Sequence, residues 1–207
     1  MKTNKFTTRV LAEVAILTAI AFALDALQGG LFRGLWPNGG SFGIAMVPIL
    51  ILCYRRGFLA GLLGGIGVSV IQCLGGVYAI ADTWWKVMLQ VLLDYILTYP
   101  MVALAGLFFK NFQAAETNKQ KALWISVGTV VGGLGKLLCH FIAGFIFWSS
   151  STPEGFPGGA WFYSLVYNGS YMIPNIIICA IIVSIIAIKQ PKLLNPNYDN
   201  MEVAHEN

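Results

Sequence analysis

An apolar run from Ala122 to Trp148 contains the two residues whose types could most readily do chemistry in this sequence. Lys136 and His140 are four residues apart, and Gly144 follows at the same interval. An ammonium, an imidazole and the space left by a glycine therefore share one helix face. A charge at membrane depth costs about 2.5–3.5 kcal/mol on insertion scales, so Lys136 needs a partner and usually has a function.

Asp94 is the charge that we expect Lys136 to meet, because only one other apolar span carries a charge near its middle. Lys86, Gln90 and Asp94 follow one another at intervals of four residues, and Tyr95 comes next. Lipid would not tolerate this polar stripe, so it should face the interior of a bundle. A Lys136–Asp94 pair that only fixes helix packing is one interpretation. A small-molecule site into which both side chains project is the favoured one.

A later apolar run begins with Tyr163, Tyr167 and Tyr171, again at intervals of four residues. Such a stripe alone is more often packing than binding. Asn168 is the stronger candidate for a site, because a buried amide must find partners and offers both a donor and an acceptor.

Composition places all of these residues in a membrane. The 207-residue chain is 57% hydrophobic and 11% charged, with a mean hydropathy of +0.71. A soluble domain of this size cannot bury so much apolar surface, so we expect an integral membrane protein. The net charge of +4 is no nucleic-acid signal, because the basic residues lie in short connections. The four cysteines fall in apolar runs without metal-type spacing.

Hydropathy and helix breakers predict an all-α bundle of six transmembrane helices, near 9–28, 40–54, 57–76, 86–109, 122–147 and 161–188. Together they form one domain, 9–190, between an N-terminal tail, 1–8, and a C-terminal tail, 191–207. Of the 13 Lys and Arg, ten lie in these tails, at the adjoining ends of the first and last helices, and in the second and fourth connections, whereas two lie on the other side. The positive-inside rule therefore predicts that both termini are cytoplasmic. A cleaved signal peptide is disfavoured, because the first run is long enough to span.

Aromatic residues are frequent in the predicted external connections, 29–39, 77–85 and 148–160. For most of them an aromatic belt at the lipid headgroups is the simpler interpretation. Rings above a charged cavity would also suit a flat or cationic ligand. The tryptophans considered for that second role are Trp36, Trp84 and Trp148.

Small residues form a ridge on the first predicted helix, at Ala15, Ala19 and Ala23. A ridge of this kind lets a second helix approach closely. It could pack inside the bundle or dock a partner protein, and the pattern alone does not decide between them.

Several chemistries are excluded by the sequence. The Gly-rich stretch before Lys136 lacks the Ser or Thr and the first Gly of a phosphate loop, and it lies in an apolar run. His140 and His205 are the only histidines, so no His cluster is available for a metal. If transport is active, its energy must come from another subunit or an ion gradient.

The motifs that identify a family are the alanine ridge, GSFGIAMVPIL from Gly40, RRG from Arg55, LDY around Asp94, HFIAGFIFW from His140 and YSLVYNG from Tyr163. With them, most of the chain resembles the thiamine-specific substrate-binding subunits, or S components, of energy-coupling factor transporters. The family usually has Glu where this chain has Asp94, and Trp84 stands where a tyrosine is expected.

The resemblance implies a six-helix bundle of the bacterial plasma membrane that binds thiamine from outside, without enzymatic activity or a cofactor. Its implied partners are a transmembrane coupling subunit, docked on the alanine ridge, and two cytoplasmic ATPase subunits. The ligand-contacting positions that it implies are Trp36, Trp84, Asp94, Tyr95, Lys136, His140, Gly144, Trp148, Tyr163 and Asn168. Lys136 is expected to hold Asp94 ionised and oriented.

Two alternatives stay open at this point. The first is an S component for another vitamin or precursor, such as hydroxymethylpyrimidine. The second is a stand-alone ion-coupled carrier that uses Lys136 and Asp94 as a proton relay.

Overall fold

The computed structural model describes residues 7–32 and 34–195, and this part of the chain contains helices and no strand. The long segments are α1 (Thr8–Phe32), α2 (Val47–Arg56), α3 (Phe58–Leu74), α7 (Asn118–Phe147) and α8 (Gly159–Lys189). A sixth segment, 84–113, is built from α4 (Trp84–Val91), the π turn η1 (Leu92–Ile96), α5 (Thr98–Val102), the 3₁₀ stretch η2 (Ala103–Phe108) and α6 (Phe109–Gln113). Short 3₁₀ turns follow at η3 (Ser149–Ser151) and η4 (Pro191–Leu193).

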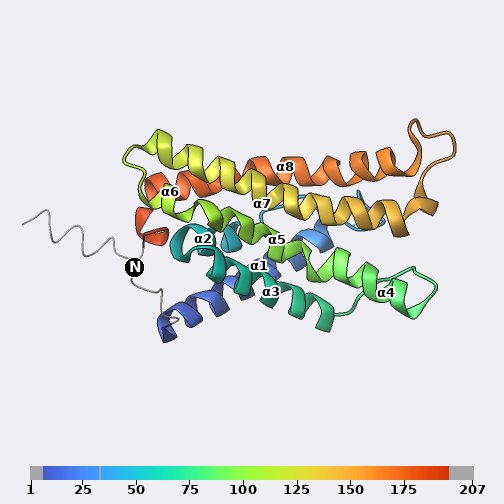
Figure 1. Cartoon of the computed structure of the whole chain (residues 1–207), viewed down its shortest axis with the longest axis horizontal. Helices are drawn as coiled ribbons and strands as arrows, with labels where there is room; N and C mark the ends of the chain where they lie inside the picture. Colours follow the sequence, from blue (N-terminus) through green and yellow to red (C-terminus); the bar gives the residue numbers. More distant parts are fainter. Residues whose placement is uncertain (1–6, 33, 196–207) are drawn as a thin grey trace, which may run out of the picture.

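The six segments form one elongated bundle in which α7 and α8 lie side by side along the long axis (Figure 1). The connections 75–83 and 148–158 gather at one end, and the start of α1 and η4 lie at the other (Figure 1). Four segments are long and apolar enough to cross a membrane: α1, 84–113, α7 and α8. The predicted all-α bundle of six helices is confirmed, although α2 and α3 are shorter than the rest.

The second predicted helix, 40–54, is wrong in its extent. It begins at Val47, with Pro48 in the first turn, where the missing N–H of proline costs no hydrogen bond. Residues 40–46 instead belong to the connection that leads out of α1. Gly57, at φ 88°, ends α2 and begins α3, because a left-handed backbone allows the sharp reversal between them.

The π turn η1 changes which residues of the segment 84–113 face inward. The Leu97 N–H bonds the Leu92 carbonyl at 2.9 Å, so this turn holds one residue more than an α-helical turn. Lys86 is therefore not on the interior stripe with Asp94, as the interval of four residues predicts. Its ammonium pairs instead with the exposed Asp82 at 2.8 Å.

Gln90 remains fully buried and holds a connection in place. Its Oε1 accepts hydrogen bonds from the Ile80 and Ala81 amides at 3.1 and 3.3 Å. The connection 75–83 is thereby fastened to α4, and this fixes the position of Tyr78 in the same connection.

A cluster of charges joins three elements at the end of the bundle that holds the start of α1. Glu13 of α1 accepts two hydrogen bonds from each of Arg55 and Arg56 at the end of α2, at 2.7–3.0 Å. Arg55 also donates to the Lys192 carbonyl in η4 at 2.7 Å. Glu13 therefore holds α1 against α2, and Arg55 links α2 to η4.

Small residues divide into two groups by what they face. A Cβ added at Gly65 would meet the Tyr99 carbonyl at 2.7 Å, and one at Gly132 would meet the Val102 carbonyl at 2.6 Å, so these glycines let helices pack closely. Ala15, Ala19 and Ala23 are exposed instead. The ridge on α1 is thus free of the bundle, and the interpretation that it packs internally is wrong.

Candidate functional site

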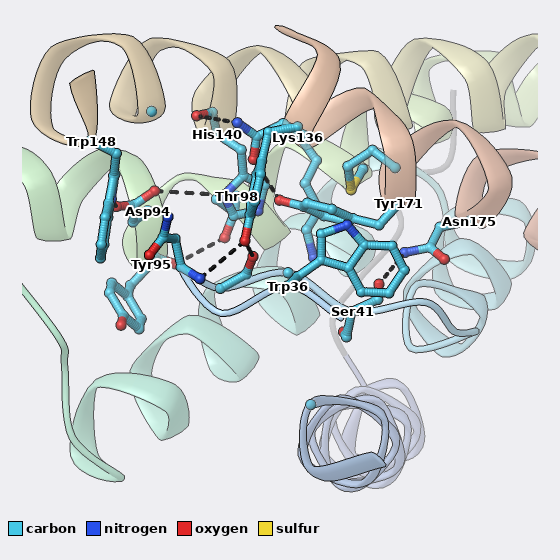
Figure 2. A pocket seen from close by; sticks show the side chains of 18 of the residues that line it. Trp36, Ser41, Asp94, Tyr95, Thr98, Lys136, His140, Trp148, Tyr171 and Asn175 are labelled. Carbon is cyan, nitrogen blue, oxygen red and sulfur yellow. Dashed lines mark hydrogen bonds and ion pairs between the residues drawn. The ribbon is translucent and has the colours of Figure 1, made fainter. Parts of the chain in front are cut away.

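A cavity of about 500 Å³ opens between the π turn, α7, α8 and the connection that follows α1 (Figure 2). Its size lies within the range of about 300–1,000 Å³ that is usual for small-molecule sites. Nine of the ten predicted ligand-contacting residues line it: Trp36, Asp94, Tyr95, Lys136, His140, Gly144, Trp148, Tyr163 and Asn168. The predicted face of Lys136, His140 and Gly144 on α7 is therefore directed into one hollow.

Asp94 lies opposite the outer part of α7. Its Oδ1 is 3.6 Å from the Nδ1 atom of His140, and its Oδ2 accepts a hydrogen bond from the Trp148 indole N–H at 3.4 Å. Both the carboxylate and the imidazole keep nearly a fifth of their side-chain surface exposed. The group can therefore bind a donor from a ligand without first breaking a closed ion pair.

The expected Lys136–Asp94 pair is wrong. Among the described residues, the basic side chain beside Asp94 is His140, with 3.6 Å between its Nδ1 and Asp94 Oδ1. The Lys136 ammonium lies over the Tyr99 ring, 3.6 Å from its centroid. Lys136 is one helical turn from His140 along α7, so the two side chains reach different levels of the cavity and meet different partners.

Asp25 of α1 is a cavity residue that the sequence interpretation missed. Its Oδ1 accepts a short hydrogen bond from the Tyr99 hydroxyl, and its Oδ2 accepts one from Gln72 Nε2 at 2.7 Å. The predicted helix ended at residue 28, which would place Asp25 at the headgroups. Because α1 continues to Phe32, Asp25 lies deeper. An acidic residue within the first apolar run was the available signal.

Asn168 organises the α8 side of the cavity through internal contacts. Its Nδ2 donates to the Ser164 carbonyl at 2.9 Å, and its Oδ1 accepts from the Tyr171 hydroxyl at 2.7 Å. Gly144 leaves room for this group, because an added Cβ would overlap the Ser164 hydroxyl and lie 3.0 Å from Asn168 Nδ2. The prediction that a buried amide must find partners here is confirmed.

Trp84 is not part of the cavity, and the prediction that it lines the site is wrong. It is the first residue of α4 and 76% of its surface is exposed. Tyr78, from the connection before α4, lines the cavity instead and lies 5.7 Å from the Trp148 ring. Its amide donates to the Tyr95 hydroxyl at 2.9 Å, which holds the connection against the π turn.

The connection after α1 covers the cavity from the side of α8. The Asn38 amide donates to the Tyr167 hydroxyl, which donates to the Gly39 carbonyl, both at 3.0 Å. Asn175 Nδ2 donates to the Ser41 carbonyl at 2.8 Å (Figure 2). These contacts bring Trp36 beside Tyr171, with 5.7 Å between the ring centroids.

Known proteins resemble this chain over nearly its whole length. Residues 11–195 match the profile of a family described as thiamine transporter protein. The thiamine transporter ThiT of Bacillus subtilis is 37% identical over 89% of this chain and 93% of its own. ThiT of Lacticaseibacillus paracasei is 28% identical over 89% of each chain.

A solved structure of ThiT from Listeria monocytogenes superposes with a TM-score of 0.72, over 90% of this chain and 97% of that one, at 28% identity. The fold and the sequence therefore point to one family. The chain belongs to the thiamine transporter family, and it is a multi-pass protein of the bacterial plasma membrane and a transport protein rather than an enzyme.

Proposed function

We propose that this protein is the substrate-binding membrane subunit of an energy-coupling factor importer, and that it captures thiamine from outside the cell in the cavity described above. The observation that carries the proposal is the convergence of a carboxylate, an imidazole and several aromatic rings in one hollow of about 500 Å³. The names of the relatives, all thiamine transporters, support the choice of ligand.

Thiamine joins a flat aminopyrimidine to a permanently cationic thiazolium, and the cavity offers groups for both halves. Asp94 and Tyr163 provide polar atoms for the edge of the aminopyrimidine. Trp148 and His140 provide flat faces, and attraction between an aromatic face and the thiazolium contributes about 0.5–2 kcal/mol. Asn168 acts by positioning Tyr171, because its own polar atoms are already bonded.

The direction of transport follows from the charges in the connections. With both termini in the cytoplasm, the cavity lies near the connections 75–83 and 148–158, and it opens toward the outside. Glu13, Arg55 and η4 then lie at the cytoplasmic end. The exposed ridge Ala15, Ala19 and Ala23 provides a flat path along α1 for a transmembrane coupling subunit, and two ATPase subunits bound to that partner would supply the energy.

A stand-alone carrier with a proton relay is the weaker alternative. That relay needs Lys136 and Asp94 to exchange a proton, yet their contacts lead to Tyr99 and His140. Uptake that persists in cells without the ATPase partners and stops on addition of an uncoupler would favour the carrier.

Tryptophan fluorescence of detergent-solubilised protein tests the binding step. Thiamine at micromolar concentration should quench the emission saturably, because Trp36 and Trp148 line the cavity. Trp148→Phe should remove a large part of the quench. The matched variant Trp84→Phe should leave the amplitude as in the wild type, because Trp84 lies outside the cavity. The absence of a saturable quench would overturn the proposal.

A further inference from the structure

Asp25 is the second carboxylate of the cavity, and its contacts lead toward Lys136. Tyr99 donates its hydroxyl to Asp25 and presents its ring to the Lys136 ammonium at 3.6 Å. A phenol that donates to a carboxylate gains electron density in its ring, and this strengthens the attraction between the ring and a cation. Tyr99 therefore couples the two charges, although they do not touch.

Lys136 is a buried cation in the cavity wall, and the ring of Tyr99 is the contact that its ammonium makes. Only 8% of its surface is exposed, and its Nζ atom lies 3.6 Å from the centroid of the Tyr99 ring. Asp25 is the carboxylate on the other side of Tyr99, because the Tyr99 hydroxyl donates to Asp25 Oδ1 while its ring faces Lys136. Burying a cation without a compensating negative charge costs free energy. The position of Asp25 is therefore part of what allows Lys136 to stay charged in the cavity.

The charged residues that line the cavity determine its net charge. Among the described lining residues, Asp25 and Asp94 are carboxylates and Lys136 is an ammonium. Two negative charges and one positive charge give a net charge of −1 when His140 is neutral. Without Asp25 the net charge would be zero, and Lys136 would repel a cation in the same hollow.

We propose that Asp25 is a specificity-determining residue, whose carboxylate compensates Lys136 through the Tyr99 ring and leaves the cavity with the net negative charge that selects a cationic ligand. The inference rests on the proposed function, because it concerns the thiazolium half of thiamine. A purely structural role for Asp25 would affect charged and neutral ligands equally.

The test is a selectivity ratio: the dissociation constant of neutral hydroxymethylpyrimidine divided by that of thiamine, measured by calorimetry at mildly alkaline pH. Asp25→Asn should lower this ratio about tenfold, because it weakens the binding of thiamine and leaves the affinity for the neutral pyrimidine unchanged. The double variant Asp25→Asn/Lys136→Met restores a net charge of −1, and its ratio should return to within about threefold of the wild type. Any contact that Lys136 makes with the pyrimidine common to both ligands cancels in the ratio.

Asp82→Asn is the matched control, because it removes an exposed carboxylate outside the cavity, and its ratio should equal that of the wild type. An unchanged ratio in Asp25→Asn would overturn the inference. If Asp25→Asn does not fold, the selectivity ratio of the double variant tests the inference. A folded double variant with a near wild-type ratio supports charge compensation, and one that stays unfolded or keeps a low ratio overturns it. Wild-type protein that fails to bind thiamine would overturn the proposed function, and the inference with it.

Discussion

His140 and Asp94 face each other across the cavity, from α7 and the π turn, with 3.6 Å between Nδ1 and the nearer carboxylate oxygen. The sequence predicts that Asp94 pairs with Lys136, but its neighbours are the His140 imidazole and the Trp148 indole N–H. The Lys136 ammonium lies over the Tyr99 ring, whose hydroxyl donates to Asp25 of α1 on another side of the same hollow. This separation allows Asp94 to accept a hydrogen bond from a ligand.

Replacing Asp94 by Asn tests that role. The variant keeps the size of the side chain but removes the charge that attracts His140 and a ligand donor. Hydrogen bonds to a charged group contribute about 1.5–3 kcal/mol, so thiamine affinity should fall roughly 10- to 100-fold in a calorimetric titration. Asp82→Asn should bind as the wild type does. Equal affinity in both variants would show that Asp94 does not contact the ligand.

Gly144→Ala tests the close approach of α7 and α8 at the cavity wall. The added methyl group would overlap the Ser164 hydroxyl and press on Asn168, which positions Tyr171. Overpacking of this kind costs about 1–3 kcal/mol, and we expect weaker thiamine binding together with a lower melting temperature. Gly30→Ala is the control, because nothing lies within 4 Å of an added Cβ there. Wild-type binding by Gly144→Ala would mean that the wall can move freely.

The charge cluster at the start of α1 should be important for stability. Glu13→Gln removes the carboxylate that Arg55 and Arg56 share, and the free energy of unfolding should fall by about 2 kcal/mol. Thermal denaturation in detergent measures this loss. Arg9→Gln should cost less than about 1 kcal/mol, since Arg9 is 70% exposed and forms only a surface pair with Glu13. Similar losses in both variants would contradict the role of the cluster.

Ala19→Trp should separate binding from transport. A large ring on the exposed ridge would block the approach of a coupling subunit without reaching the cavity, so thiamine binding should persist while uptake into cells is lost. Ile177→Trp, at an exposed position of α8, should leave uptake unchanged. Normal uptake by Ala19→Trp would show that the ridge faces only lipid.

The part of the site that could be predicted from the sequence is the part that lies on regular helix. Lys136, His140 and Gly144 share a face of α7 because four-residue spacing brings side chains together in an uninterrupted helix. Asp94 and Tyr95 reach the same cavity although the π turn breaks that rule, since a charge within an apolar span has to face inward.

The errors have separate physical causes, and in each of them a local contact or a helix end differs from what four-residue spacing and hydropathy predict. Lys86 forms an ion pair with Asp82 and does not face the cavity. Gln90 holds the connection before α4 in a position where Tyr78 lines the cavity, and Trp84 faces outward. Asp25 was missed because hydropathy ended the first helix too early. The predicted tails, 1–8 and 191–207, fall for the most part outside the described residues.

The most direct measurement is a structure of the detergent-solubilised protein determined with thiamine bound. We predict density for the two rings inside the cavity, with the aminopyrimidine edge at Asp94 and aromatic side chains, Trp148 among them, against the ring faces. Thiamine bound elsewhere, or an empty cavity at saturating ligand, would contradict the account.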